Sequence, residues 1–541
     1  MRTIYLLIVF LPVIFCNCKK ENIAEYDIVV YGATPAGIIA AYSAASTNQK
    51  VLIIEQTGHV GGMNTSGLTT AEVEHMTKES ITGFAREFYI KMGEKFPDGY
   101  FETFAMGRKL NFKKGDPAFF FESHIAEQVF LEMLEKKNVE VIFDKYVINV
   151  KTKENVIKSI ELNDSIYISG KIFIDCSYEG DLMAKAGVSY TYGRESISTY
   201  NESLAGIRLI DDTIFTKTVD AQNKLLPLFS KYDTIIEGQG DKKVMTFNFR
   251  PTMTRVEENK KDIYPPENYD SSDFDFLANY LENYPETNIW DLIGIYKWGN
   301  NKAEFNNKQS SIISLGLFGG NTDYIQADYA KRKDIYNAHK YYTLGFLYFL
   351  ANDSRVPEKL REQTREWGYA KDEFTDNNNF PYYLYIREAR RMTGEYVHQQ
   401  SDIFINREKE DAITLGSHWI DCHHVQRIAL SDSSFTNEGR IWEIVKKPYE
   451  ISYRSIIPIK SECVNLLVPV CLSASHVGFC SIRVEPTWMQ LGHAAGTAAA
   501  IAANMNKAVQ DIDITLLQET LTEQGMIISH RSIDYIDDDD N

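Results

Sequence analysis

Residues 26–56 predict a strand, a tight turn, a helix and a second strand, and no other stretch restricts the possible folds of this chain as strongly. Residues 27–31 and 51–54 are short β-branched apolar runs of the kind found in strands buried on both faces. Between them, residues 35–45 are rich in Ala and Ile at helical spacing. The stretch therefore predicts a βαβ unit with parallel strands, and the chain an α/β fold.

The turn of this unit carries GATPAG at 32–37, which matches the dinucleotide-binding pattern G-x-G-x-x-G at its first and third glycines. Gly32 permits the tight turn and Gly37 allows close packing of helix on strand, while Pro35 suits the first helical position. Thr34 suits the helix N-cap and its hydroxyl can meet a phosphate, although its Cβ crowds the approach of a pyrophosphate. A βαβ unit without ligand is the alternative.

Two features after the helix indicate which dinucleotide binds. Glu55 ends the second strand 23 residues after Gly32, where a carboxylate accepts hydrogen bonds from an adenosine ribose. Gly61 and Gly62 follow and are succeeded by Met63, and a second glycine loop at this point is common in flavoproteins and usually missing from nicotinamide domains. The sequence thus favours a flavin dinucleotide.

Length and charge exclude some classes of protein. The 541 residues are enough for two or more domains with sizeable cores. The net charge of −18 and the pI near 5.2, without a basic cluster, argue against a nucleic-acid-binding surface. The acidic residues at the C-terminus, within 526–541, are expected to form a solvated tail.

The N-terminus predicts export. An apolar run at 4–15 follows Met1 and Arg2 and is too short to span a bilayer. Cys16 and Cys18 come next, and Lys19 follows, as at the end of a bacterial lipoprotein signal within residues 1–18. We expect a periplasmic or outer-membrane lipoprotein whose membrane contact is a lipid on Cys18 or Cys16; cleaved secretion or no export are the alternatives.

The remaining cysteines show neither a CxxC pair nor Cys/His spacing suited to zinc, and we expect no metal. Buried free thiols are the favoured interpretation, and a bridge among the last three is an alternative. These cysteines are Cys176, Cys422, Cys463, Cys471 and Cys480.

The rest of the chain indicates one domain inserted into another. After a predicted helix at 123–137, short β-rich runs to residue 174 are typical of the β-meander in flavin domains and end at Asp175. The composition then changes to aromatic, polar and charged residues. A helix is predicted at 324–349, and its aromatic residues are expected to pack in the core rather than stack on a sugar. A strand at 466–470 and a small-residue helix from Pro486 to Asn504 return to the first domain. The expected parts are 24–190 and 455–525 for the Rossmann-like domain and 191–454 for an α+β substrate domain.

Several of these segments resemble the bacterial FAD-dependent oxidoreductases found in Bacteroidetes carbohydrate-utilisation clusters. The resemblance rests on VVYGATPAGIIAA, GGMNTSGL, FIDCSYEGDLMAKAGVSYTYGRES, YIREARRMTGEY, DCHHVQR and the stretch from YRSIIPIK to LGHAAGTAAA. It implies FAD as cofactor and fixes the fold more than the reaction. The residues expected to hold FAD are Gly32, Thr34, Pro35, Ala36, Gly37, Glu55, Gly61, Gly62, Met63, Asp175, Arg483, Glu485, Gly492 and Ala495.

The expected chemistry is hydride transfer from a carbinol to flavin N5, with a protein base for the hydroxyl proton. Asp421 and His423 share one face of an extended chain and His424 lies on the other. We expect His423 to be the base, with His424 and a structural histidine pair as alternatives. Arg483 is placed to stabilise reduced flavin.

A predicted helix at 387–391 puts Arg387, Arg390 and Arg391 on one face. These side chains could clamp an acidic sugar, although a salt-bridged face is favoured. Arg387 is kept as a candidate for the catalytic site.

The sequence supports three hypotheses of function. The first is an exported FAD-dependent oxidoreductase acting on a small-molecule or glycan hydroxyl with an unknown electron acceptor. The second is redox-neutral elimination or epimerisation on a sugar, assisted by FAD. The third is a glycan-binding surface protein that keeps the flavin fold without turnover.

Overall fold

A computed structural model describes residues 23–69, 72–101, 111–209 and 212–533. The predicted export signal at 1–18, with Cys16 and Cys18, lies outside these residues, as does the end of the predicted tail after 533. The first part of that tail packs against the protein, since Met526 is buried and His530 contacts Glu450. Among the described helices, none combines the length and apolar character needed to cross a membrane.

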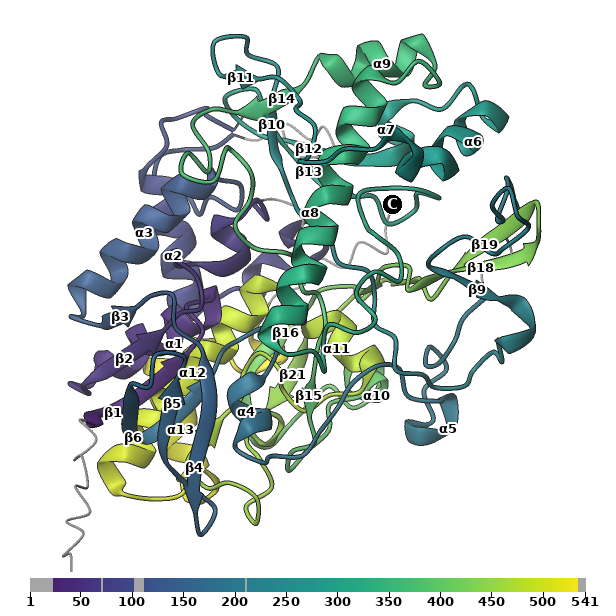
Figure 1. Cartoon of the computed structure of the whole chain (residues 1–541). Coiled ribbons are helices and arrows are strands. Elements are labelled where there is room, and N and C mark those ends of the chain that lie inside the picture. The colour runs from purple at the N-terminus through teal and green to yellow at the C-terminus, as the bar shows by residue number, and fades with distance from the viewer. Residues whose placement is uncertain (1–22, 70–71, 102–110, 210–211, 534–541) are drawn as a thin grey trace, which may run out of the picture.

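A seven-stranded sheet forms the base of the molecule, at the lower left of Figure 1. The order is β3-β2-β1-β6-β5-β4, and β22 pairs with β6. The neighbours β3, β2, β1, β6 and β22 run parallel, while β6, β5 and β4 form an antiparallel meander. The expected parallel sheet with a β-meander is confirmed. Its strands are β1 (Ile23–Tyr31), β2 (Val51–Ile54), β3 (Glu140–Ile142), β4 (Val147–Lys153), β5 (Val156–Leu162), β6 (Tyr167–Asp175) and β22 (Leu466–Leu467).

The central strand β1 supplies two hydrophobic cores because successive side chains point to opposite faces of the sheet. Ile28 and Val30 pack with α1 (Pro35–Ala45) and α12 (Glu485–Met505). Val29 and Tyr31 pack with side chains of β4, β5 and α4 (Asp181–Lys185). Burial on both faces explains why β1 has an uninterrupted apolar sequence.

Helices α1 and α12 touch through their backbones. A Cβ added to Gly496 would lie 2.9 Å from the carbonyl carbon and 3.0 Å from the Cα of Ala40, and Gly492 meets Ala36 in the same way one turn earlier. The small residues of α12 therefore serve helix packing. Through this contact and the pairing of β22 with β6, the two ends of the described chain build one domain.

Gly496→Ala should lower the free energy of unfolding by about 1–3 kcal/mol because the new methyl group overpacks against the backbone of Ala40. In an uncrowded helix the same change would stabilise by about 0.5–1 kcal/mol. Denaturant titration measures the difference. Gly58→Ala is the matched control, since a Cβ there meets nothing within 4 Å, and an equal loss in both variants would contradict the argument.

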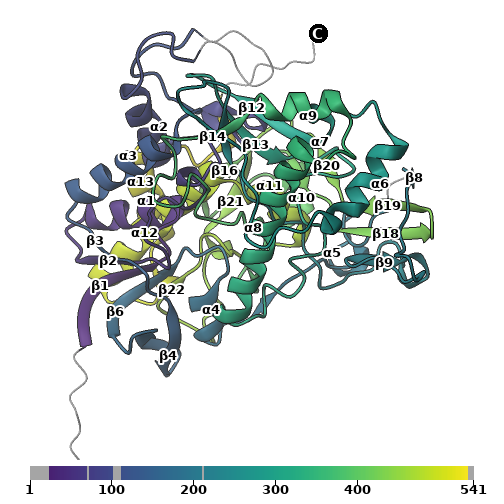
Figure 2. The ribbon, with the colours of Figure 1, turned by 45° about the horizontal axis from the view of Figure 1, so that its top comes forward.

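Between β6 and β22 in the sequence, the chain forms a region of mixed helices and strands. Figures 1 and 2 show α8 (Tyr329–Asn352) running through the middle of this region. One sheet has the order β11-β14-β10-β13-β12 and another β8-β19-β18-β9. Phe346 and Phe349 of α8 are buried, as expected for core aromatics. The strands are β8 (Ile214–Phe215), β9 (Phe229–Lys231), β10 (Thr252–Thr254), β11 (Lys260–Lys261), β12 (Ile293–Lys297), β13 (Lys302–Asn307), β14 (Gly368–Ala370), β18 (Gln426–Ser431) and β19 (Ser434–Glu438).

Further elements surround these sheets. Shorter strands form the pairs β7–β15, β16–β21 and β17–β20. The helices are α2 (Gly83–Glu94), α3 (Ser123–Lys136), α5 (Ile197–Tyr200), α6 (Asp275–Asn283), α7 (Ile289–Leu292), α9 (Glu358–Arg365), α10 (Gln400–Phe404), α11 (His476–Ile482) and α13 (Ile514–Glu523), and the paired strands are β7 (Tyr190–Thr191), β15 (Arg391–Met392), β16 (Ala412–Gly416), β17 (Ile420–Cys422), β20 (Ile441–Glu443) and β21 (Tyr449–Ser452).

Candidate functional site

The glycine turn after β1 forms the first part of the site. Gly32 has a φ of +97°, and an added Cβ would lie 2.9 Å from the amide nitrogen of Ser177, so only glycine fits. Thr34 caps α1 as expected: its hydroxyl accepts from the amide of Gly37 at 3.2 Å and donates to the carbonyl of Cys176 at 2.8 Å. Pro35 begins the helix. The turn thus directs the N-terminus of α1 to the carboxyl edge of the parallel sheet.

Glu55 lies directly beside this turn. Its Oε2 accepts from the amide of Ala33 at 2.8 Å, and its Oε1 accepts from the amide of Thr57 at 2.8 Å and from the Tyr383 hydroxyl. Burial raises the pKa of Glu55, and these donors oppose the rise. The carboxylate is therefore held rigidly at the end of β2, where the sequence places the partner of a ribose.

The second glycine loop packs on the first. The amide of Gly61 donates to the carbonyl of Ala33 at 2.7 Å. Tyr178 closes over Gly62: its hydroxyl accepts from the amide of Met63 at 3.0 Å and donates to Oε1 of Glu485 at 2.5 Å. Glu485 stands at the start of α12, so three segments far apart in the sequence meet around one tyrosine.

These residues fit an FAD molecule. Gly32, with its left-handed backbone, makes the tight turn that places the N-terminus of α1 where a pyrophosphate would bind, and Glu55 places a carboxylate at the end of β2, where a ribose would lie. Oε2 of Glu485 is buried without a hydrogen-bond partner, which leaves a polar atom for a ligand at the start of α12. Burial, with the charge of Glu72, raises the pKa of Glu485 well above its usual range.

Four of the residues expected to hold the cofactor make contacts within the protein. Asp175 is consumed by its own turn, since it accepts from the amides of Ser177 and Met183; burial raises its pKa to about 6. Gly492 lies against α1, as described above, and Ala36 is its partner in that contact. Ala495, on the same helix, is completely buried. Asp175 therefore serves its own turn, and the other three residues pack α1 against α12; their contact with the cofactor stays a prediction.

A polar cavity of about 50 Å³ lies before the N-terminus of α12. Its charged lining consists of Glu72, Arg250, Asp421 and Arg483. Val484 and a set of amide, aromatic and histidine side chains complete it: His75, Tyr296, Asn306, Asn307, Gln309, Tyr385, His418, His423 and Trp442. The volume corresponds to roughly three or four water molecules, so it accommodates the reacting end of a polar ligand.

His423 reaches the cavity with a fixed tautomer. Asn307 accepts the amide hydrogen of Gly316 through Oδ1 at 2.9 Å, so its Nδ2 donates to Nδ1 of His423 at 2.8 Å. The neutral ring then carries its hydrogen on Nε2, which lies 3.6 Å from Oδ2 of Asp421. Burial and the charges of nearby arginines hold the pKa of His423 well below 6.5. The ring is thus arranged to donate from Nε2, which differs from the expected role as a base.

Asp421 and Arg483 form the other half of this arrangement. Nη2 of Arg483 donates to the backbone carbonyl of Asp421 at 2.8 Å and lies 3.1 Å from Oδ2 of the same residue. Gln309 donates to Oδ1 of Asp421 at 3.0 Å. His424 points elsewhere, with its ring centroid 5.4 Å from that of Phe318 and its pKa lowered to about 3 by burial. The expected separation of the two histidines onto opposite sides is therefore present, and Asp421 faces the cavity with His423.

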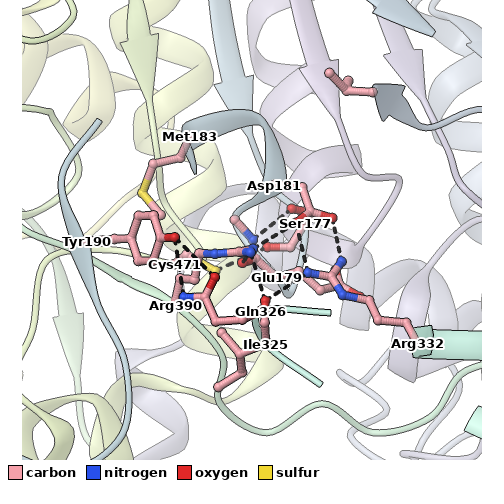
Figure 3. A network of polar contacts seen from close by, with 12 residues as sticks. Ser177, Glu179, Asp181, Met183, Tyr190, Ile325, Gln326, Arg332, Arg390 and Cys471 are labelled. Carbon is pink, nitrogen blue, oxygen red and sulfur yellow. Dashed lines mark hydrogen bonds and ion pairs between the residues drawn. The ribbon is translucent and has the colours of Figure 1, made fainter. Parts of the chain in front are cut away.

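The arginine helix predicted at 387–391 is wrong, and the three arginines bind in different places. Arg387 donates to the carbonyl of Thr246 at 2.6 Å and is not among the residues lining the cavity. Arg390 and Arg332 converge on Asp181, at 2.7 and 2.6 Å (Figure 3). Arg391 lies in β15 and contacts Glu195 and Glu388. Each buried arginine therefore binds a different set of partners. A helix would have placed the three side chains on one face, where they could not reach these separate partners.

Sequence reasoning missed most of the cavity lining. Tyr385, the first residue of YIREARRMTGEY, lines the cavity and contacts Glu72, and the nearby Tyr383 contacts Glu55; neither tyrosine was assigned a role. Their alternate spacing in PYYLYI was the one available signal, because residues two apart in an extended chain point to the same side. Arg250 and Glu72 gave no such signal.

A second, larger cleft of about 1760 Å³ is lined in part by α6, β9 and α9. Arg427 lines it and is buried, and its Nε and Nη2 atoms lack a hydrogen-bond partner. Phe229, Phe274 and Phe276 contribute apolar lining. This cleft shares no lining residue with the cavity at His423.

A comparison with known proteins matches most of the chain to one family. A family model described as FAD dependent oxidoreductase matches residues 27–521. Digeranylgeranylglycerophospholipid reductase 2 of Methanopyrus kandleri is 36% identical over 87 residues, which cover 14% of this chain and 22% of that protein. The matched stretch thus spans less than a quarter of that relative.

Solved structures are similar only over shorter stretches. The OxyS anhydrotetracycline hydroxylase from Streptomyces rimosus is 14% identical with a TM-score of 0.25, covering 36% of this chain and 38% of that one. A flavin-containing monooxygenase from Stenotrophomonas maltophilia is 13% identical with a TM-score of 0.20, covering 33% and 44%. Likenesses this distant support no conclusion on activity.

Proposed function

The chain belongs to the FAD-dependent oxidoreductase family and takes FAD as its cofactor, and from this premise we propose that it oxidises a hydroxyl group of a carbohydrate or related small molecule. The cofactor expected from the glycine turn is thereby confirmed. The substrate class rests on the cavity before α12.

The lining of that cavity suits a polyhydroxylated ligand. Glu72 and Asp421 accept hydrogen bonds, Arg250 and Arg483 donate them, and the amides of Asn306 and Gln309 do both. Tyr296 and Trp442 also line the cavity, and aromatic rings of this kind can pack on the C–H side of a sugar. A pocket for an apolar substrate would bury fewer such groups, because each unpaired buried polar atom is unfavourable.

The proposed step uses three residues of this chain. Bound FAD supplies the acceptor for a hydride leaving the carbinol carbon. His423 donates from Nε2 to the substrate oxygen and orients it, while the carboxylate of Asp421 accepts the hydroxyl proton as the carbonyl forms. Arg483 holds Asp421 in place. One hydride and one proton thus leave the alcohol, which becomes an aldehyde or ketone.

We further propose that the protein is exported and anchored by a lipid. The apolar run and Cys16 and Cys18 at the N-terminus support this location. Such a protein meets glycans outside the cytoplasm, and the electron acceptor would then be oxygen, a quinone or a partner protein. Globomycin-sensitive processing in the native host, with radiolabelled palmitate on the chain, would support the anchor; unprocessed, unlabelled protein would contradict it.

The test of the reaction is anaerobic mixing of the purified holoprotein with a panel of glycans and monosaccharides. Loss of the oxidised-flavin absorbance with stoichiometric carbonyl product is the expected result for an oxidation. Turnover without any added acceptor and without lasting loss of absorbance would favour redox-neutral sugar chemistry instead.

Glycan binding without turnover is the second candidate function, and the large cleft is the observation that favours it, because two guanidinium nitrogens of its lining residue Arg427 lack a hydrogen-bond partner. Binding of glycans by calorimetry, with a flavin that never loses absorbance, would support it over oxidation. Arg427→Ala should then abolish binding, and His423→Ala should leave it unchanged.

A further inference from the structure

Two cysteines and a histidine meet beside the cavity, on the side away from His423. Cys422 ends β17, and His476 and Cys480 lie one turn apart on α11. All three are buried. Sγ of Cys422 lies 3.6 Å and Sγ of Cys480 lies 3.9 Å from Nε2 of His476, and the three atoms are within 4.8 Å of one another.

These separations are those of ligands around one metal ion. With a metal–sulfur bond of about 2.3 Å and a metal–nitrogen bond of about 2.0–2.1 Å, tetrahedral angles place sulfur and nitrogen about 3.5 Å apart and trigonal angles about 3.8 Å. The observed 3.6 Å falls within this range, and the observed 3.9 Å lies just above the trigonal value. Small side-chain adjustments would bring all three atoms within bonding distance of one ion.

The outer partners of His476 favour the same conclusion. Its Nδ1 lies 3.0 Å from both carboxylate oxygens of Glu388, so Nδ1–H donates to the carboxylate and Nε2 faces the two sulfurs. Arg391 in turn holds Glu388. A carboxylate that fixes the tautomer and orientation of a ligating histidine is the usual second layer of protein zinc sites.

We propose that Cys422, His476 and Cys480 bind a soft d¹⁰ metal ion, Zn²⁺ or Cu⁺. Thiolate and imidazole are the ligands that such ions prefer, and a metal cation offsets the negative charge of two buried thiolates. Among the described residues three protein ligands converge here, which suits trigonal Cu⁺ or Zn²⁺ with one open position. Binding releases the two thiol protons and involves no redox step.

The ion would join two segments that build the cavity. Cys422 lies between Asp421 and His423, and Cys480 lies three residues before Arg483. A metal bridge therefore fixes β17 relative to α11 and, with them, the contact between Asp421 and Arg483. The proposal does not depend on which substrate is oxidised.

Metal analysis of the full-length holoprotein tests the site directly. Purified without chelators, it should contain about one zinc or copper ion per chain, and elemental analysis distinguishes the two. X-ray absorption at the metal edge should show two sulfur ligands at about 2.3 Å and a nitrogen at about 2.0–2.1 Å. A protein without stoichiometric metal that takes up neither Zn²⁺ nor Cu⁺ after reduction would overturn the proposal.

Variants separate the site from other buried thiols. Cys422→Ser and Cys480→Ser should each lower metal affinity by more than tenfold, and Glu388→Gln by about 10–100-fold. Cys471→Ser is the matched control, because Cys471 is buried but its Sγ contacts the carbonyl of Tyr178 instead. Equal metal content in all four variants would contradict the assignment. So would a disulfide between Cys422 and Cys480, found by peptide mapping of the wild-type protein.

Discussion

Replacing Glu55 with glutamine should weaken FAD binding by about 10–100-fold, since it removes a charged acceptor whose hydrogen bonds contribute about 1.5–3 kcal/mol each. The carboxylate serves the amides of Ala33 and Thr57 with different oxygens. Glutamine has one acceptor oxygen, so its NH₂ group must face one of these amides. Fluorescence titration of the apoprotein with FAD measures the dissociation constant, and thermal unfolding without FAD separates cofactor loss from misfolding.

Tyr383→Phe is the control for this prediction. It removes one hydroxyl from Glu55 but leaves both amide donors and the carboxylate in place. FAD affinity should stay within about threefold of the wild type, which is less than 1 kcal/mol. If Tyr383→Phe lost FAD as completely as Glu55→Gln, the tyrosine and not the carboxylate would be the main anchor.

Removing His423 should abolish substrate-driven flavin reduction while FAD stays bound. His423→Ala takes away the donor at Nε2 and should slow anaerobic reduction by about 10²–10⁴-fold, the usual range for a group that acts on a proton or its oxygen. His423→Gln keeps an N–H donor near the position of Nε2 and should retain much of the rate. Stopped-flow absorbance measures both, with a substrate found in the glycan screen.

The glutamine variant distinguishes the two roles of His423. A general base is lost in both variants, whereas a donor survives in His423→Gln, so an equally inactive pair would return the base role to the histidine. His424 lies beside Phe318 and away from the cavity, so His424→Ala should leave the rate of flavin reduction unchanged.

The pH dependence gives an independent check. Because the pKa of His423 lies well below 6.5, the ring is neutral on both sides of that value. The rate should therefore show no step near pH 6.5, where an unperturbed histidine titrates (about 6.5). A rate that falls as the pH drops through 6.5 would mean that the ring titrates normally and accepts the proton.

The βαβ unit, the meander and the return of the chain through α12 were predictable because each has a local pattern. Buried strands are short and β-branched, Gly32 and Thr34 sit at fixed places in a turn, and Pro486 stands in the first turn of α12. The non-helical backbone that residues 387–391 adopt in place of the predicted helix was not predictable in this way. Its residues are good helix formers, but buried partners in other segments override that preference.

The cavity was the least predictable part because its walls come from residues 72–484, which are remote in sequence. The tautomer of His423 depends on Asn307, which depends on Gly316, and no spacing in DCHHVQR encodes that chain of hydrogen bonds. The thiol cluster was missed for the same reason, since Cys422 is 54 residues from His476. The pair His476 and Cys480, four apart on a helix, was a visible signal.

The contact of Gly492 with Ala36 determines how early in synthesis the FAD-binding domain can complete its folding. Helix α1 leaves the ribosome early, yet its backbone partner is made more than 450 positions later, near the end of synthesis. Contacts this distant along the chain form slowly, and until then the apolar surface of α1 stays open to misassociation. Flavin loading should therefore be a late event, and chains arrested before α12 should accumulate as colourless, chaperone-bound intermediates.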